Sequence, residues 1–321
     1  MRKVLLVILI LVPVAMMAQQ IPQFSQRGID MLTFNPAFAG SKGYSELLLH
    51  HRSQWRSYDG APVTQNLTYQ GMLGKSTGIG FSFVKDEIGP ISTSGLKIAY
   101  AYHIDMNAVK LTFGLSGDIY QYGINGNEVT THEENDPAIL YALSEKVWRP
   151  DATFGTFLYN EHFYFGFSIL QLLGSTVELY KNDPAMGTLP LARHFYMNGG
   201  YNFSPIRNFD FEPSILWSKA KGSPAQFELN IYAQYMSQIL LGGSYRWGDA
   251  FAIVAGFKMK ERLKFAYSYD IVVSPLRTYN SGSHELIISW IIPNKLGKWN
   301  RWRHEYQYDF NPKTHKWKSR W

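Results

Sequence analysis

Apolar and polar residues alternate over most of the chain. Between residues 226 and 235, every second position is apolar, and the positions between them are Gln226, Glu228, Asn230, Tyr232 and Gln234. Successive side chains of a β-strand point to opposite faces, so this period predicts strands with one apolar face and one polar face. The same alternation occurs in the segments 109–116, 161–169 and 263–271.

Fourteen such segments follow one another, beginning near residues 44, 63, 76, 92, 109, 151, 161, 193, 208, 225, 238, 250, 263 and 283. The even-numbered connections are tight, and the long ones, 123–150, 171–192 and 275–282, are all odd-numbered. An even strand count with short periplasmic turns and longer outer loops is typical of bacterial outer-membrane barrels. We therefore predict an all-β fold, a transmembrane outer-membrane β-barrel of about 14 antiparallel strands at residues 43–292. A secreted β-sandwich is the alternative, although nothing obliges its loop lengths to alternate.

A sheet that crosses a membrane is expected to close into a barrel. An unpaired backbone amide in hydrocarbon costs several kcal/mol, and an open sheet has two unpaired edges. Aromatic residues near the segment ends are candidates for the interfacial girdles of such a barrel. Each of them can equally be an ordinary core residue. The candidates are Tyr44, Trp55, Tyr69, Tyr122, Tyr159, Trp217, Trp247 and Trp290.

The first residues have the pattern of an export signal. Arg2 and Lys3 precede an apolar stretch at 4–15, and small residues stand at Ala15 and Ala18. This combination predicts a signal peptide at 1–18, with a retained membrane anchor as the alternative. The following residues, 19–42, are then expected to form a periplasmic N-terminal segment.

Composition adds constraints to this picture. Charged residues make up 17 % of the chain, against roughly 25 % in soluble domains. There is no cysteine, so disulfides, thiolate metal sites, cysteine nucleophiles and a lipid anchor on cysteine are excluded. The formal charge of +6 falls to +4 without Arg2 and Lys3, and residues 294–321 alone carry +6. The rest of the expected mature chain is therefore slightly acidic.

The last residues, 293–321, form a basic and aromatic tail that we expect to be periplasmic. Interleaved cations and aromatic rings suit nucleic acid, but an exported chain rarely meets nucleic acid in the periplasm, so no nucleic-acid partner is expected. Docking to an acidic partner, anionic lipid headgroups or cell-wall polymer is the favoured interpretation. A solvated tail and a plug of the lumen are the alternatives. The candidate docking residues are Trp299, Arg301, Trp302, Arg303, Trp317 and Lys318.

Signals for catalysis, metals and cofactors are weak. The acidic segment 132–136 lacks the spaced carboxylates of a calcium loop. His50 and His51 are adjacent in a strand, so they point to opposite faces and cannot chelate one ion together. Ser116 lacks the spacing of a nucleophile elbow, and the glycines Gly78 and Gly80 indicate close packing rather than a nucleotide site. We expect no enzymatic activity, no metal and no cofactor.

Four motifs in register carry a family resemblance. They are Pro-Gln-Phe-Ser-Gln at 22–26, Asn-Pro-Ala-Phe-Ala-Gly at 35–40, Arg-Ser-Gln-Trp at 52–55 and Gly-Ala-Pro-Val-Thr-Gln at 60–65. This order and spacing resembles the PorP/SprF family of outer-membrane proteins, which belong to the type IX secretion and gliding systems of Bacteroidetes. The matching motif residues are Asn35, Pro36, Gly40, Arg52, Gln54, Trp55, Pro62 and Thr64. The chain departs from the family pattern by continuing about thirty residues beyond Trp290, which puts the usual C-terminal insertion signal in doubt.

The motifs also predict local structure. Pro36 disfavours helical geometry at Asn35, and Gly40 permits a turn, so this stretch is expected to bend the chain into the first strand. Arg52, Gln54 and Arg56 share one face of that strand if its alternation continues. An inward arginine is expected to pair with an interior carboxylate, for which the sequence offers Asp118 and Asp270.

The resemblance implies a non-enzymatic component of the cell outer membrane. Such a component acts by protein-protein contacts in the export or surface anchoring of adhesin-like cargo. Its expected partners are periplasmic and outer-membrane secretion proteins or an exported adhesin, together with outer-membrane lipid. The alternative function is an outer-membrane channel or transporter for small solutes.

Overall fold

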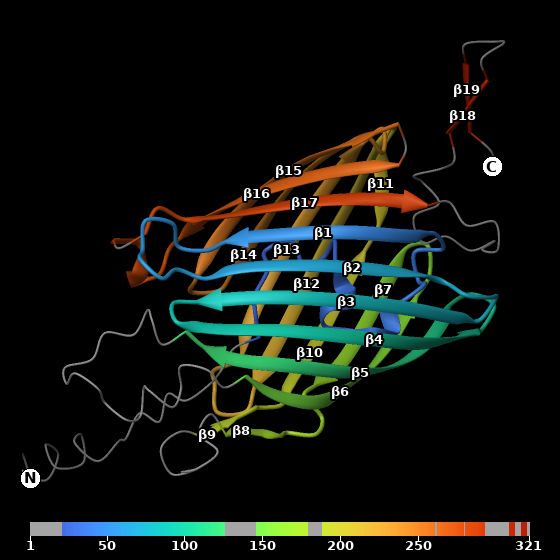
Figure 1. The fold of residues 1–321 in the computed structure, drawn as a ribbon. Coiled ribbons are helices and arrows are strands. Elements are labelled where there is room, and N and C mark those ends of the chain that lie inside the picture. Colours follow the sequence, from blue (N-terminus) through green and yellow to red (C-terminus); the bar gives the residue numbers. More distant parts are fainter. Residues whose placement is uncertain are drawn as a thin grey trace, which may run out of the picture.

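The computed structural model describes residues 21–125, 146–178, 188–260, 262–278, 280–292, 308–311 and 316–319. Fourteen of the strands in these ranges form one ring (Figure 1). In ring order they are β1 (Ser45–Ser53), β2 (Val63–Met72), β3 (Thr77–Ile88), β4 (Ile91–Asp105), β5 (Lys110–Ile124), β6 (Val147–Tyr159), β7 (Phe163–Leu170), β10 (His194–Tyr201), β12 (Phe209–Ala220), β13 (Gln226–Tyr235), β14 (Ile239–Arg246), β15 (Ala250–Met259), β16 (Leu263–Val272) and β17 (Ser283–Ile292).

Each ring strand has two antiparallel neighbours. The first and last strands, β1 and β17, pair over their whole length from Ser45↔Ile292 to Ser53↔His284, which closes the barrel. The described chain also contains short strands outside the ring. These are β11 (Phe203–Ile206) beside β12, the pair β8 (Thr176–Glu178) and β9 (Thr188–Pro190), and the pair β18 (Tyr308–Asn311) and β19 (Lys316–Ser319).

The predicted strand count and closure are confirmed. Most ring strands begin within two residues of the predicted position, and the largest difference is at β6, which begins at Val147 rather than near 151. The sandwich alternative is wrong, because the fourteen strands form one closed sheet rather than two stacked ones. No helix in the described ranges is both long and apolar enough to cross a membrane.

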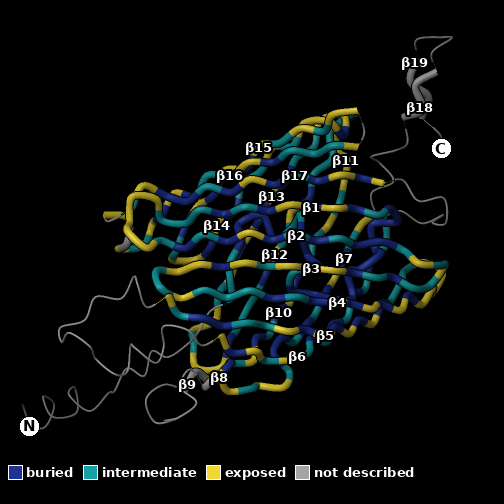
Figure 2. Tube along the Cα trace, viewed as in Figure 1, coloured by how far each residue is buried: buried dark blue, intermediate teal, exposed yellow. Residues whose placement is uncertain are grey.

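The two faces of the sheet differ in chemistry as the alternation predicts. On β13, Leu229 is 51 % exposed and points outward, whereas its neighbour Glu228 is 2 % exposed and points into the lumen. Exposed and buried residues alternate in the same way along the other strands (Figure 2). Apolar side chains thus cover the outside, where a bilayer would meet them, and polar side chains line the lumen.

The girdle prediction is only partly right. Trp247 and Trp290 are exposed near strand ends on the outside of the barrel. Tyr44, Tyr122 and Tyr159 are buried instead, because their positions in the alternation point inward. Trp55, Tyr69 and Trp217 are half-buried.

The two ends of the barrel also differ. We call the end where β1 begins and β17 ends the termini end, and the opposite end the loop end. Described connections at the termini end are short, such as 73–76 between β2 and β3 and 106–109 between β4 and β5. At the loop end lie the connection 54–62 and the connection 273–282, which contains the 3-10 helix η5 (Pro275–Thr278). This agrees with the predicted parity of long and short connections.

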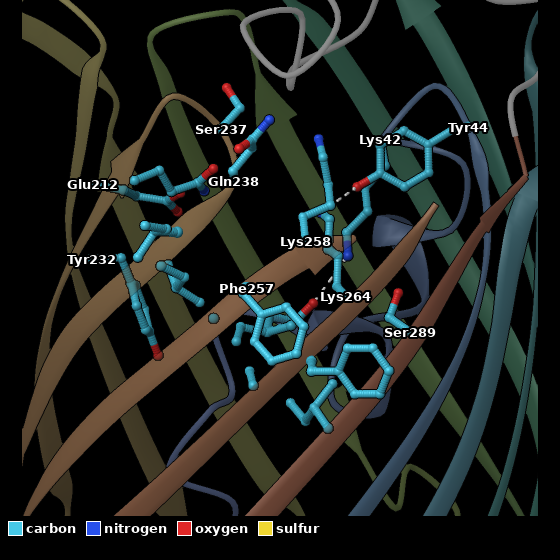
Figure 3. A pocket seen from close by; sticks show the side chains of 18 residues that line it. Lys42, Tyr44, Glu212, Tyr232, Ser237, Gln238, Phe257, Lys258, Lys264 and Ser289 are labelled. Atoms are coloured by element: carbon cyan, nitrogen blue, oxygen red, sulfur yellow. Dashed lines mark hydrogen bonds between the residues drawn. The ribbon is translucent and has the colours of Figure 1, made fainter. Parts of the chain in front are cut away.

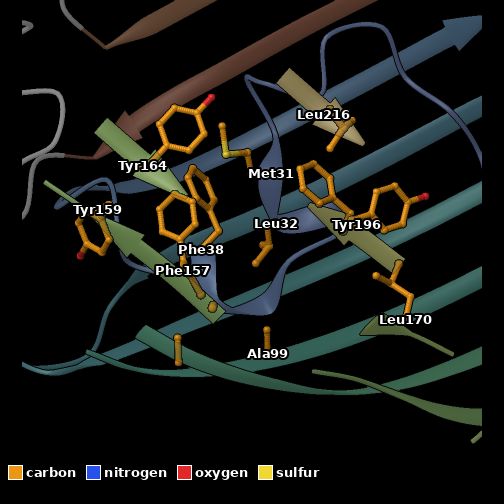
Figure 4. Close-up of a cluster of buried hydrophobic side chains, with 14 residues drawn as sticks. Met31, Leu32, Phe38, Ala99, Phe157, Tyr159, Tyr164, Leu170, Tyr196 and Leu216 are labelled. Carbon is orange, nitrogen blue, oxygen red and sulfur yellow. The ribbon is translucent and has the colours of Figure 1, made fainter. Parts of the chain in front are cut away.

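Residues 21–44 lie inside the lumen and pack against its wall rather than extending away from the ring. They contain two 3-10 helices, η1 (Met31–Thr33) and η2 (Pro36–Phe38), and η2 contacts β4, β5 and β6. Side chains of this segment form the largest buried apolar cluster with the barrel wall (Figure 4). That cluster includes Met31, Leu32, Phe38, Phe157, Tyr164, Tyr196 and Leu216.

The lumen segment runs from the loop end to the termini end. Ile21 lines the same cavity as Ile88 and Ile91, which flank the β3–β4 connection at the loop end. The backbone amide of Gly40 donates to Gln70 Oε1 near the last residues of β2, and the chain then enters β1 at the termini end. The side of a membrane that each end faces, and with it the periplasmic placement of 19–42, stays a prediction.

Candidate functional site

The lumen segment is held first by charged residues near the loop end. Register places Arg52 of β1 directly opposite Glu285 of β17, and both side chains point inward. Arg52 forms ion pairs with Glu285 Oε1 and, at 2.9 Å, with Asp270 Oδ2 of β16. The predicted pair with Asp270 is confirmed. The prediction for Asp118 is wrong, because its carboxylate accepts from hydroxyl groups on its own and the adjacent strand, Ser116 and Thr153.

Ser25 lies at the centre of these charges. Its hydroxyl donates to Asp270 Oδ2 at 2.6 Å and accepts from Arg52 Nη1 and Arg246 Nη2, each at 3.0 Å. Its backbone amide donates to Glu285 Oε1 at 2.5 Å. A hydroxyl offers one donor and two acceptor sites, so all three of these sites are used.

Glu285 also holds the next residue of the segment. The backbone amide of Gln26 donates to Glu285 Oε2 at 3.1 Å, and its side-chain amide donates to Ser268 Oγ at 3.1 Å. His50 Nε2 lies 3.1 Å from the same Glu285 oxygen, and its ring stacks on Phe24 with centroids 4.0 Å apart. One wall carboxylate thus binds two successive backbone amides of the segment.

We call this group the loop-side lock. It consists of Arg52, Arg246, Asp270 and Glu285 on the wall with Ser25 and Gln26 on the segment. Arg246 is balanced in turn by Glu228 Oε2 at 3.4 Å and Asp249 Oδ2 at 3.0 Å. Desolvated charges of this kind are tolerated only when paired, and removing one partner typically costs about 3–5 kcal/mol.

Halfway along the lumen, the segment is held by close packing and by the hydrogen bonds of one side chain rather than by charges. Asn35 has the extended conformation that Pro36 requires, and its Oδ1 accepts from the Ala37 amide at 3.0 Å, which caps η2. Its Nδ2 donates to the carbonyl oxygens of Thr156 at 3.0 Å and Phe167 at 3.5 Å. These contacts confirm the predicted bend and anchor it to β6 and β7.

Glycines in the wall make room for this bend. A Cβ added to Gly114 would lie 2.2 Å from the Ala37 amide nitrogen, and one on Gly155 would lie 2.1 Å from Asn35 Oδ1. Gly78 has the same role beside the Ala39 carbonyl, which agrees with the packing role predicted for it. We call this region the mid-lumen seat; it consists of Asn35, Pro36 and Ala37 on the segment with Gly114 and Gly155 on the wall.

A cationic pocket opens near the termini end (Figure 3). Its volume is about 80 Å³, and Lys42, Lys258 and Lys264 line it together with Tyr44. Lys42 Nζ donates to the Ile29 carbonyl at 3.0 Å and pairs with Glu46 at 2.5 Å, while Lys264 Nζ donates to Tyr44 Oη at 3.4 Å. Lys42 and Lys264 therefore stabilise the end of the lumen segment.

The remaining motif residues organise the loop-end rim. Gln54 Oε1 accepts from Arg52 Nε at 3.5 Å, and the Gln54 amide donates to the Pro62 carbonyl at 2.9 Å. The Trp55 amide donates to Ser283 Oγ at 3.2 Å. Thr64 Oγ1 donates to Asp86 Oδ1 at 2.5 Å.

The expected inward position of Arg56 is wrong. The strand β1 ends at Ser53, and Trp55 has a positive φ of 48°, so the alternation does not continue to Arg56. Its side chain is exposed at the rim.

Several predicted features lie wholly or partly outside the described residues. These are the signal peptide at 1–18, the acidic segment 132–136 and the tail residues Trp299, Arg301, Trp302 and Arg303. Trp317 and Lys318 belong to β19, where only the backbone is described. Among the described residues, no group of three or more His, Asp or Glu side chains is arranged to hold a metal.

The sequence analysis missed most of the loop-side lock. Ser25 and Gln26 belong to the first motif, but nothing in the motif indicates which wall residues they meet. Glu285 and Arg246 occupy polar positions in alternating strands, which marks them as inward-facing without showing their partners.

Comparisons with known proteins identify the family of the chain. A family model described as type IX secretion system membrane protein PorP/SprF matches residues 16–290. No curated protein matches the chain.

Among solved structures, the chain is similar to a FadL homologue of Pseudomonas aeruginosa, with 12 % identity, a TM-score of 0.45, and coverage of 84 % of this chain and 94 % of the other. It is also similar to the outer membrane protein Omp33 of Acinetobacter baumannii, with 7 % identity, a TM-score of 0.45, and coverage of 77 % and 97 %. The family match spans the first motif, the lumen segment and nearly the whole ring, and the closed barrel has the apolar exterior of an outer-membrane protein. The chain therefore belongs to the PorP/SprF family of type IX secretion system membrane proteins and is a β-barrel of the cell outer membrane.

Proposed function

We propose that this barrel is a non-enzymatic component of the type IX secretion and gliding machinery that works through protein-protein contacts at its two ends. In this role it takes part in the export or surface anchoring of adhesin-like cargo. Its partners are secretion proteins of the periplasm and outer membrane, or the exported adhesin itself. Membership of the PorP/SprF family supports a role in type IX secretion. The lumen segment packed inside the barrel supports action through protein contacts rather than through passage of solutes.

The observation that carries the proposal is the lumen segment. A solute channel needs a continuous wet path, whereas residues 21–44 are fixed to the wall near the loop end, at mid-lumen and near the termini end. Moving them would break the hydrogen bonds from the Ser25 and Gln26 amides to the buried Glu285 carboxylate and expose the apolar cluster around Phe38. A barrel filled in this way is suited to present its rims to other proteins.

The tail supplies the expected periplasmic contact. Residues 293–321 follow β17 at the termini end and carry the aromatic and basic docking candidates Trp299, Arg301, Trp302, Arg303, Trp317 and Lys318. Cations interleaved with aromatic rings favour an acidic protein partner through charge pairing and ring burial. The loop-end connections would meet cargo on the other side.

The first test measures partner binding. Gentle extraction of the full chain should retain periplasmic partners, and deletion of residues 294–321 should lose them. A second variant, Arg301→Gln with Arg303→Gln and Lys318→Gln, keeps the tail length and should show partial loss that grows with salt concentration. Heat-modifiable migration on gels provides the control for barrel insertion, and unchanged co-purification in both variants would refute the docking role.

The second test separates this function from the solute channel. The intact protein should be nearly silent in planar bilayers, and loosening the lumen segment with Glu285→Ala should create current. A channel would instead conduct as the wild type, with a conductance that changes when lumen-facing Arg52 is replaced by Gln. Steady wild-type conductance would favour the transporter.

A further inference from the structure

A second and larger cavity lies between the lumen segment and the wall towards the loop end. Its volume is about 240 Å³, and its apolar lining includes Phe24 and Phe34 of the segment and Leu96, Tyr120 and Tyr196 of the wall. Cavities of roughly 150 Å³ already hold benzene. The space is therefore large enough for an organic molecule with an aromatic or short aliphatic body.

Arg27 lines this cavity and distinguishes it from a simple packing void. Arg27 is only 6 % exposed, and its guanidinium carbon lies 5.9 Å from the centre of the Tyr196 ring. Within the described ranges, Arg27 makes no hydrogen bond to another residue and no ion pair. By contrast, Arg52 and Arg246 of the loop-side lock each meet two carboxylates.

A buried cation without a counter-charge is costly, because desolvation is not repaid by pairing. The Tyr196 ring beside the guanidinium supplies a cation–π contact but no counter-charge. An anion placed in the cavity would supply the missing charge. A guanidinium binds a carboxylate through two parallel hydrogen bonds, so this is the best-matched partner.

The other charged residues of the cavity do not remove the imbalance. Lys97 is buried, donates to the Thr33 carbonyl at 3.0 Å and lies directly opposite Asp118 of β5 in the strand register. Asp86, the carboxylate of this lining, accepts from Thr64 Oγ1. The lining thus carries two cations and one carboxylate, and Arg27 forms no ion pair with that carboxylate.

We propose that this cavity binds an organic anion, with one carboxylate at Arg27 and an apolar body against Phe24, Phe34 and Tyr120. The site is distinct from the loop-side lock and does not depend on the proposed role of the barrel rims. Its ligand enters from the loop end, where Ile88 and Ile91, each 44 % exposed, border the cavity.

The test uses 4-phenylbutyrate as the probe and the uncharged 4-phenylbutanamide as its isostere, titrated calorimetrically into the full-length protein in detergent. The carboxylate should bind at least about tenfold more tightly than the amide, because a hydrogen bond to a charged group is stronger than one between neutral groups. Arg27→Gln should abolish this preference, and Arg27→Lys should restore part of it. Arg56→Gln, at an exposed arginine outside the cavity, is the matched control and should leave the affinity unchanged.

A second variant tests the volume separately from the charge. Thr93→Trp places a large ring at a lining position and should weaken both probes while Arg27 remains in place. Unaltered thermal unfolding of each variant shows that the barrel is intact. The proposal is overturned if the wild type binds neither probe, if Arg27→Gln retains the preference, if Thr93→Trp changes nothing, or if inorganic phosphate binds as tightly as 4-phenylbutyrate.

Discussion

The loop-side lock and the mid-lumen seat hold the same segment by different physics. In the lock, Ser25 and Gln26 are bound by wall charges, and Glu285 alone accepts from both of their amides. In the seat, η2 fits against glycines, and the polar contacts come from the single side chain of Asn35. Removal of a charge should therefore destabilise the lock, and addition of side-chain atoms should destabilise the seat.

The largest expected effect is the loss of a lock charge. Glu285→Ala leaves Arg52 with one carboxylate and removes the acceptor of two segment amides, so we expect destabilisation of about 3–5 kcal/mol. Glu87→Ala is the matched control, because Glu87 pairs with Lys85 at the surface, where such pairs contribute about 0–1 kcal/mol. Urea unfolding followed by tryptophan fluorescence measures both variants.

A double variant identifies the cause of that loss. Arg52→Met combined with Glu285→Met removes both buried charges and should be more stable than Glu285→Ala alone, because the unpaired cation is gone. If the double variant is as unstable as the sum of its single variants, the lock contributes through its separate hydrogen bonds rather than through charge pairing.

The seat should respond most strongly to added volume. Gly114→Val places atoms where the Ala37 amide lies, which should cost about 1–3 kcal/mol and make the lumen segment accessible to protease. Gly117→Val, on the same strand with no atom near its added Cβ, should change stability by no more than about 0.5 kcal/mol. Equal effects of the two substitutions would contradict the seat.

Removing the polar anchor of the seat should have a smaller effect. Asn35→Ala deletes the cap of η2 and the bond to the Thr156 carbonyl, for an expected cost of about 1–2 kcal/mol. Asn35→Asp keeps the oxygen that accepts from Ala37 but loses the donor. It should therefore be no more stable than the alanine variant if the contact with β6 matters more than the cap.

These two regions also show what a single sequence can reveal. The strands were predictable because the alternation of apolar and polar residues can be read from one sequence. The bend at Asn35 was predictable because Pro36 restricts the backbone of its direct neighbour. The pair Arg52–Asp270 was found because both positions are polar in alternating strands. Glu285 was not assigned to it, since the β1–β17 register depends on how the ring closes.

Sequence patterns could not predict that the lumen segment lies inside the barrel. Residues 21–44 have no strand period, and their burial depends on a wall assembled from strands up to about 260 residues away in the chain, as between Ser25 and Glu285. Period and propensity report local structure, whereas this burial is set by closure of the whole barrel. The glycines of the seat indicated close packing but not what packs against them.

Asp30, which lies between the lock and the seat, should give the smallest effect. It is buried, its Oδ2 accepts from Thr68 at 3.2 Å and from Asn66 at 3.3 Å, and burial raises the pKa of its carboxyl above the ordinary value. A raised pKa favours the folded state while the carboxyl is protonated, and that contribution is lost as the pH rises through the folded-state pKa. Asp30→Asn should therefore gain up to about 1 kcal/mol over the wild type at pH 7.

The pH dependence decides whether this gain comes from ionisation. As the pH falls through the folded-state pKa, the difference between the two proteins should begin to shrink. It should vanish once the pH is below the ordinary pKa of the carboxyl, where the wild-type carboxyl is neutral in both the folded and the unfolded state. Urea unfolding at a series of pH values measures it. A difference that stays constant with pH would show that Asp30→Asn acts through packing against Asn66 and Thr68, and that the segment tolerates a charged carboxylate between the lock and the seat.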